Sequence, residues 1–120
     1  MITHIKFVSI PTSDQDRSLA FYIDKLGFKV VTDQPMGPGQ RWIELRVGKS
    51  DTRFVLFNMD KGPKPGTPFN GAFACDSVER TYEELSTRGV EFTAPPKKEP
   101  WGTFVVMKDP DGNEFVLSTK

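Results

Sequence analysis

The residue types that most often carry catalysis are scarce in this sequence. It has one cysteine, Cys75, and one histidine, His4. A single cysteine cannot form a disulfide within the chain, and one cysteine with one histidine cannot build a zinc cluster. No second histidine is present to orient a Cys–His catalytic pair. The sequence therefore argues against a disulfide scaffold, a zinc finger and Cys–His catalysis.

Charge and length narrow the class of protein further. Sixteen basic side chains balance sixteen acidic ones in 120 residues, so no overall field attracts nucleic acid or an anionic membrane. No apolar run reaches the roughly 20 residues of a spanning helix, and the N-terminus lacks the features of a secretory signal. We therefore expect one cytoplasmic domain without nucleic-acid or membrane partners. Ten Phe, two Trp and two Tyr leave aromatic rings to line a pocket.

The first half of the chain predicts a strand, a helix and three strands. Residues 5–10 are rich in β-branched and aromatic side chains and end at Pro11. A helix follows from Ser13, capped by Ser13 or Asp14 and ended by Gly27. Its predicted apolar stripe has helical spacing and consists of Leu19, Tyr22, Ile23 and Leu26. The predicted strands are residues 28–32, 41–47 and 53–59, with a hairpin at 48–51.

The second half repeats this order after a Pro- and Gly-rich linker at about residues 60–68. We expect a strand at 69–75, a helix at 77–88 ended by Gly89, and strands at 90–93, 103–108 and 113–118. Module one is thus about residues 1–60 and module two about residues 69–120. The predicted fold is α+β: two βαβββ modules in one chain that form a curled mixed sheet around a cup, with the helices outside.

Two motifs in this order resemble a known family. The first runs from Asp14 through the Arg-Ser-Leu-Ala-Phe-Tyr segment of residues 17–22 to Leu-Gly-Phe at 26–28. The second is Asp-Pro-Asp-Gly-Asn at 109–113. Together with the repeat between them, they resemble the glyoxalase, bleomycin-resistance and extradiol dioxygenase superfamily, also called vicinal oxygen chelate proteins. The resemblance covers nearly the whole chain and implies the cup-shaped fold.

Many members of that family hold a divalent metal in the cup through His and Glu side chains on the strands. The resemblance places the four ligand positions at Phe7, Glu44, Asn70 and Val116. Only Glu44 carries the family's residue type, and a carboxylate with an amide, a phenyl ring and an isopropyl group is a poor metal site. We therefore expect no tightly bound catalytic metal, while a weak divalent site made of Glu44 and Glu114 stays open.

Strand alternation groups further side chains with these positions. Trp42 and Arg46 share a face with Glu44, Ala72 and Ala74 share one with Asn70, and Glu114 and Ser118 flank Val116. This mixture of apolar walls and few polar atoms is typical of a small-molecule pocket. Trp101, in a Pro-Trp-Gly loop, would close the rim. The candidate ligand-binding residues are Phe7, Trp42, Arg46, Asn70, Trp101 and Val116.

Four of the candidates also have a structural interpretation. Glu44 would be a surface residue paired with Arg46 or Arg41, Phe7 and Trp42 would only pack, and Asn70 would bond its own backbone.

Three functions remain. The first is binding of a small organic molecule in the manner of the family's drug-sequestering proteins. The second is a lyase, isomerase or dioxygenase with Glu44 as catalytic base or weak metal ligand. The third is a non-catalytic structural or regulatory module. The resemblance also implies a homodimer.

Overall fold

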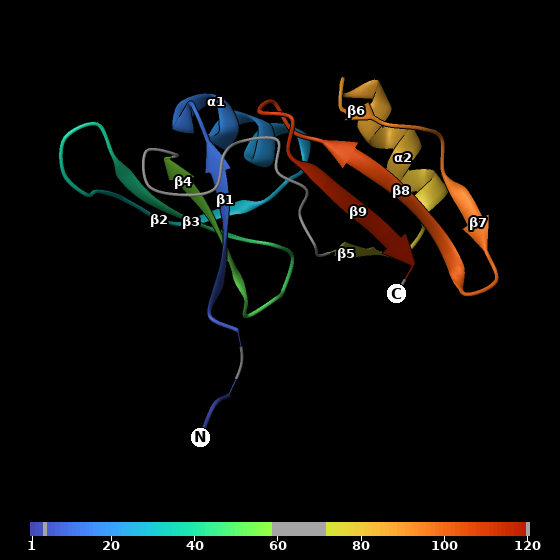
Figure 1. The fold of residues 1–120 in the computed structure, drawn as a ribbon, viewed down its shortest axis with the longest axis horizontal. Coiled ribbons are helices and arrows are strands. Elements are labelled where there is room, and N and C mark those ends of the chain that lie inside the picture. The colour runs from blue at the N-terminus through green and yellow to red at the C-terminus, as the bar shows by residue number, and fades with distance from the viewer. Residues whose placement is uncertain (4, 59–71, 120) are drawn as a thin grey trace. The chain divides into compact units, whose positions relative to one another are not determined.

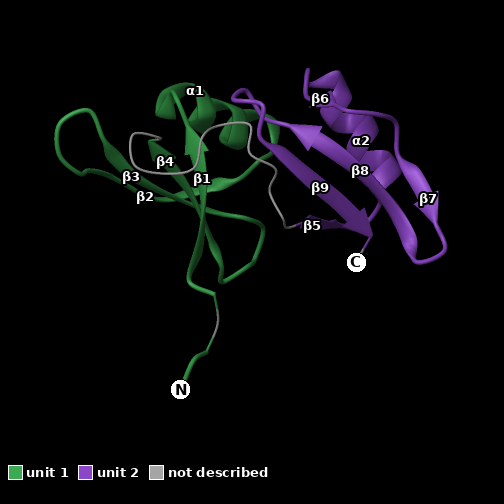
Figure 2. Cartoon of the chain, in the orientation of Figure 1, with its two compact units in different colours: residues 1–65 green, residues 66–120 purple. Residues whose placement is uncertain are grey.

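Two units with nearly the same order of elements follow one another along the chain (Figures 1 and 2). The computed structural model describes residues 1–3, 5–58 and 72–119. Unit 1 is Met1–Pro65 and unit 2 is Gly66–Lys120. The elements of unit 1 are β1 (Phe7–Thr12), α1 (Gln15–Ala20), the π-helix η1 (Phe21–Lys25), β2 (Lys29–Pro35), β3 (Arg41–Arg46) and β4 (Arg53–Asn58). Those of unit 2 are β5 (Ala72–Cys75), α2 (Val78–Thr87), β6 (Glu91–Phe92), β7 (Lys97–Glu99), β8 (Gly102–Lys108) and β9 (Glu114–Thr119).

The sheets of the two units have equivalent strand orders. Unit 1 has the order β1-β4-β3-β2, and unit 2 has β5-β9-β8-β6 with β7 paired to β8. In each sheet the first strand of the unit runs parallel to its last strand, and the remaining pairs are antiparallel. Neither sheet is closed. The predicted α+β class and the repeated βαβββ order are confirmed.

In unit 1, α1 packs on one face of the sheet (Figure 1). Asp14 caps this helix, because its side chain accepts a hydrogen bond of 3.0 Å from the backbone N–H of Arg17. Gly27 ends the helical segment with a φ of 77°, a backbone conformation that glycine adopts without steric cost. Both ends therefore lie where the sequence predicts them.

The side of the helical segment that faces the sheet differs from the predicted stripe. Tyr22 is buried as predicted, but Leu19, Ile23 and Leu26 are only half-buried, and Phe21, outside the predicted stripe, is buried. The physical reason is the π-helical turn from Phe21 to Lys25, which has more residues per turn and brings two consecutive aromatic rings toward the sheet. The predicted spacing assumed a regular α-helix.

Buried polar side chains also hold α1 to the sheet. Gln15 donates to the backbone oxygens of Arg41 (2.7 Å) and Leu56 (3.0 Å) and accepts from the backbone N–H of Arg41 (3.2 Å). The hydroxyls of Ser18 and Thr12 lie 2.6 Å apart. Because buried polar groups are costly without partners, these bonds allow polar residues on the covered side.

The covered face of each sheet alternates as predicted. Ile43 and Leu45 of β3 and Phe115 and Leu117 of β9 are buried. Residues between them, such as Glu44 and Val116, are partly accessible. The sequence therefore assigns the two faces of these strands correctly.

Some boundaries differ from the prediction. Strand β1 continues through Pro11 to Thr12, which is possible because β1 lies at the end of its sheet's strand order and a proline there removes no central hydrogen bond. Strand β7 was not predicted, since its Lys-Lys-Glu sequence has no apolar alternation. The predicted linker at 60–68, the start of the strand at 69 and His4 lie outside the described residues. None of the helices in the described ranges combines the length and the hydropathy needed to cross a bilayer.

Candidate functional site

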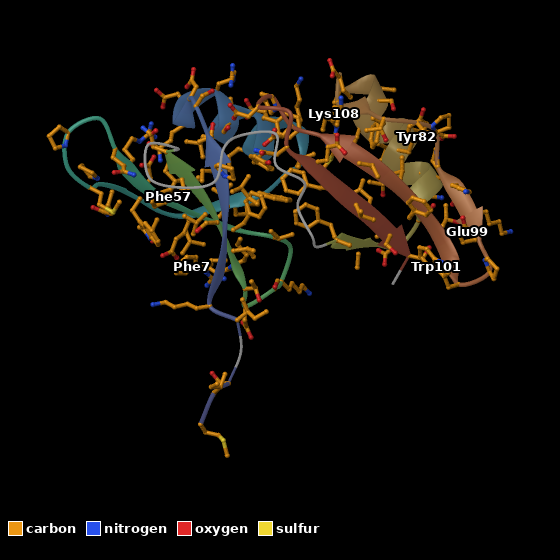
Figure 3. The ribbon with its side chains drawn as sticks, in the orientation of Figure 1. Phe7, Phe57, Tyr82, Glu99, Trp101 and Lys108 are labelled. Carbon is orange, nitrogen blue, oxygen red and sulfur yellow. The ribbon has the colours of Figure 1, made fainter. Side chains whose placement is uncertain are left out.

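The candidate residues of unit 1 lie on the face of its sheet opposite α1, which we call helix-free face 1. Side chains that are paired in register across a sheet point to the same side. The register therefore defines two complete rows on this face. The first row is Phe7, Arg53, Arg46 and Lys29, and the second is Ser9, Val55, Glu44 and Thr32. Strand alternation adds the pairs Pro11–Phe57 and Trp42–Gln34 at the next positions. Figure 3 labels Phe7 and Phe57 near the two ends of the β1–β4 pair.

Three of the predicted site residues make direct contact on this face. The indole Nε1–H of Trp42 donates to Oε1 of Glu44 at 2.7 Å. The Phe7 ring meets the Trp42 ring edge-on, with centroids 5.4 Å apart and planes at 88°. Phe7 is 39% exposed, and Trp42 and Glu44 are half-buried. The contact forms an aromatic platform with one carboxylate oxygen engaged by the indole.

Glu44 has no ion pair with the arginines that the structural interpretation assigned to it. Arg41 lies on the helix side, where its guanidinium contacts Asp16 and pairs with Asp33 at 2.7 Å. The hydrogen bond from Arg41 holds the pKa of Asp33 below its usual value, and the bonds to Asp33 and Asp16 raise the pKa of Arg41. Arg46 is exposed on the same face as Glu44 but lies outside ion-pair distance of it. Glu44 is therefore bonded to an aromatic donor and remains accessible.

The candidate residues of unit 2 belong to a second, more apolar surface. The register of β5, β9 and β8 places Ala72 beside Val116 and Val116 beside Val106, opposite the side covered by α2. The same surface, helix-free face 2, carries Ala74, Ser118 and Phe104 in the next row. Val116 is partly accessible, as a pocket wall requires. Asn70 lies outside the described residues.

Trp101 lies at the turn between β7 and β8 (Figure 3). Its ring stacks on Phe104, with centroids 5.8 Å apart and planes at 20°. It is 64% exposed, in contrast to the half-buried Trp42. A largely exposed indole at the edge of a face is suited to a rim position, as the sequence suggests.

The described residues do not fit the divalent metal that the resemblance implies. Phe7 and Val116 have no lone pair to donate, and one oxygen of Glu44 already accepts the indole hydrogen bond. In the described ranges no group of three or more His, Cys, Asp or Glu side chains comes together in a metal-binding arrangement. Glu44 and Glu114 belong to different units.

The single cysteine also lacks the features of a catalytic thiol. Cys75 is half-buried at the end of β5. Burial raises the pKa of its thiol, a hydrogen bond with Thr81 partly opposes that rise, and the negative charge of Asp76 adds to it. A raised thiol pKa leaves little reactive thiolate at neutral pH.

Sequence reasoning missed two residues of helix-free face 1, Lys29 and Arg53. Both lie beside Arg46 in the first row, one on β2 and one on β4. Strand alternation shows only which residues of the same strand share a face with Lys29 or with Arg53. The pairing register, which short loops and a bulge after Val30 determine, was needed to place them side by side.

Comparison with known proteins agrees with this fold. A model of the Glyoxalase/Bleomycin resistance protein/Dioxygenase superfamily matches residues 2–117. The uncharacterized protein YetH of Bacillus subtilis (strain 168) is 39% identical over 119 residues, which is 98% of each chain.

Two solved structures are similar over almost their full length. A superfamily member from Sphaerobacter thermophilus DSM 20745 has a TM-score of 0.90 and 32% identity, over 99% of this chain and 98% of that one. TnmS3, an antibiotic binding protein from Streptomyces sp. CB03234, has a TM-score of 0.87 and 34% identity, over 98% and 96%. The resemblance seen in the two sequence motifs is thus confirmed, and the chain belongs to the Glyoxalase/Bleomycin resistance protein/Dioxygenase superfamily.

Proposed function

We propose that this protein binds a small, partly aromatic organic molecule and does so without a tightly bound catalytic metal. The observation that carries the proposal is the contact of Phe7, Trp42 and Glu44 on helix-free face 1. Two of the positions where a catalytic member would present metal ligands are Phe7 and Glu44 here. Phe7 supplies an aromatic ring in contact with Trp42, and Glu44 accepts a hydrogen bond from the Trp42 indole.

This arrangement has the chemistry of a ligand pocket. Such pockets have mostly apolar walls and a few polar atoms that orient the ligand. Phe7 and Trp42 offer aromatic surface that is partly accessible, and aromatic pairs favour a further ring at their edge or face. The Glu44 carboxylate keeps lone pairs beyond the one that Trp42 uses, so it can accept a hydrogen bond from the ligand.

The candidate residues of unit 2 are proposed as ligand contacts on their own surface, with Val116 as an apolar wall of helix-free face 2 and Trp101 at its rim. Asn70 lies outside the described residues. On helix-free face 1, Arg46 would bind the ligand at the polar border of the platform. The similarity to TnmS3, which is named an antibiotic binding protein, supports binding and sequestration of an organic molecule over turnover. The homodimer that the resemblance implies remains a prediction.

A thermal-shift screen of aromatic compounds, each with and without a divalent metal, tests this function. A bound compound raises the unfolding midpoint by mass action. We expect stabilisation by ligands in metal-free buffer and no further increase with the metal. Stabilisation that requires a stoichiometric divalent ion would contradict the proposal and favour a chelate-type lyase or dioxygenase.

The Glu44→Gln variant separates binding from catalysis. The amide keeps an oxygen that can accept the Trp42 hydrogen bond, so we expect ligand affinity to change by less than about tenfold, or about 1.4 kcal/mol. If the screen finds a compound that is chemically converted, loss of turnover with retained binding would instead identify Glu44 as a catalytic base.

A further inference from the structure

Helix-free face 1 has a row of three basic side chains next to its aromatic platform. Lys29, Arg46 and Arg53 are consecutive cross-strand partners on β2, β3 and β4. Lys29 and Arg46 are exposed and Arg53 is partly exposed. Although the sixteen basic and sixteen acidic residues of the chain balance, positive charge is concentrated along this row.

Within the described ranges no Asp or Glu lies within ion-pair distance of these three side chains. Arg53 donates one hydrogen bond of 3.2 Å to the backbone oxygen of Ser50, which leaves most of its guanidinium donors available. Like charges directly opposite each other destabilise a sheet. A bound anion would remove that repulsion.

The position of the row relative to the platform sets the size of a ligand that can reach both. Phe7 is the register partner of Arg53, so the backbone that carries the edge of the aromatic platform lies about 5 Å from the backbone of Arg53. Along β3, Arg46 lies two residues from Glu44 and four from Trp42, or roughly 7 and 13 Å. One or two fused rings on the platform would therefore place an attached acid group at the row.

Glu44 favours one orientation of such a ligand. Its carboxylate lies in the second row, beside Val55 and between the basic row and Trp42. Repulsion from this carboxylate disfavours an acid group over the platform, and attraction favours it at Arg46 and Arg53. A guanidinium also matches a carboxylate in geometry, because its donors form a planar fork.

We propose that the ligand of this site is an aromatic carboxylic acid, with its rings on the Phe7–Trp42 platform and its carboxylate bound by Lys29, Arg46 and Arg53. This inference rests on the proposed function and specifies the chemical class of its ligand. It adds Lys29 and Arg53 to the binding residues.

The test compares 2-naphthoic acid with its neutral analogue 2-naphthamide by isothermal titration calorimetry. We expect wild-type protein to bind the acid at least tenfold more tightly. The double variant Arg46→Gln with Arg53→Gln should lose the preference and bind the acid no better than the amide. Raising the salt concentration should weaken binding of the acid only, because screening acts on the charge pair.

The repeat supplies a matched control variant. Lys108 occupies the position in unit 2 that corresponds to Arg46, since it is the register partner of both Glu91 and Glu114. Lys108→Gln should leave the preference for the acid intact. Unchanged unfolding midpoints for all variants would show that the substitutions leave the fold in place.

The other possible results distinguish failure of this inference from failure of the proposed function. Equal affinities of wild-type protein for the acid and the amide overturn the inference and leave the proposed function standing. A preference for the acid that survives the double variant also overturns it, because the charge would then be bound elsewhere. Failure of both compounds to bind counts against the proposed function as well.

Discussion

The corresponding charged rows of the two units differ in sign. In unit 1 the row consists of Lys29, Arg46 and Arg53, which are all positive. In unit 2 the corresponding positions are Glu91, Lys108 and Glu114, where one cation lies between two carboxylates. The row in unit 2 thus has two carboxylates beside its one cation, whereas no described carboxylate forms an ion pair with the three cations of the row in unit 1.

The covered faces of the two sheets are much more alike. Both bury aromatic and aliphatic side chains under one helix, with Phe54 in unit 1 and Phe115 in unit 2 at 2% and 0% exposure. The repeat therefore preserves the packing that forms each unit and varies the surface that meets a ligand. This is the pattern expected when folding constrains one face of a sheet and binding constrains the other.

The largest expected effects on stability come from substitutions in the helix-covered faces of the two sheets, which are alike. Phe54→Ala removes ring contacts with Tyr22 at 4.9 Å and Phe28 at 5.5 Å, and Phe115→Ala removes a contact with Phe73 at 5.6 Å. Each variant should lower the free energy of unfolding by about 3–5 kcal/mol, because a buried aromatic ring is lost and a cavity remains. Urea denaturation measures the free energy of unfolding of both variants. A loss below about 1 kcal/mol in either would break the equivalence of the covered faces.

The two tryptophans should differ in their effect on ligand binding. Trp42→Ala removes the platform indole and the donor to Glu44, so affinity for 2-naphthoic acid should fall by about ten- to a hundredfold, or roughly 1.4–2.8 kcal/mol. Trp101→Ala removes a ring that is 64% exposed and should change affinity by about threefold or less. Calorimetric titration of both variants with 2-naphthoic acid gives the two losses of affinity. A larger loss for Trp101→Ala would reverse the assigned roles of platform and rim.

The smallest expected effect is on the pH dependence of the stability of the fold. Arg41 lowers the pKa of Asp33, so the ionised carboxylate stabilises the fold above the usual pKa near 3.8, and this contribution is lost as the pH falls through the lower folded value. Asp33→Asn should therefore cost up to about 1 kcal/mol at pH 7. The deficit relative to wild type should shrink below about pH 4.

Unit 2 offers the control for that measurement. Its ion pair between Lys97 and Glu99, 3.3 Å long, involves a lysine side chain that is 70% exposed, so Glu99→Gln should have little effect on stability. Urea denaturation at pH 7 and pH 3 provides the comparison. A deficit for Asp33→Asn that grows at low pH would contradict the sign of the pKa shift.

Local sequence signals predicted most of this fold. Asp14 and Gly27 delimit the first helical segment, and the alternation around Glu44 and Val116 assigns both faces of their strands. The buried side of the first helical segment was predicted only at Tyr22, since Gln15 and Ser18 become favourable core residues only through hydrogen bonds to distant backbone and to Thr12. Sequence alone cannot reveal such bonds.

The candidate site was predicted in part for a similar reason. Phe7, Trp42 and Glu44 were grouped by family position and by alternation, and the structure brings their side chains into contact. Lys29 and Arg53 were not included because their relation to Arg46 depends on pairing between strands that are separated in sequence. Residues on one strand can be grouped by counting, whereas neighbours on adjacent strands require the register.

The hydrogen bond from Trp42 to Glu44 gives this protein an optical reporter at its own candidate binding face. The emission of an indole responds to the charge and hydrogen bonding at its ring nitrogen. The chain has two tryptophans, so replacing Trp101 with phenylalanine leaves Trp42, whose indole contacts the carboxylate, as the single tryptophan. Ligand binding at the platform would then change the wavelength or the intensity of the tryptophan emission, without any attached dye.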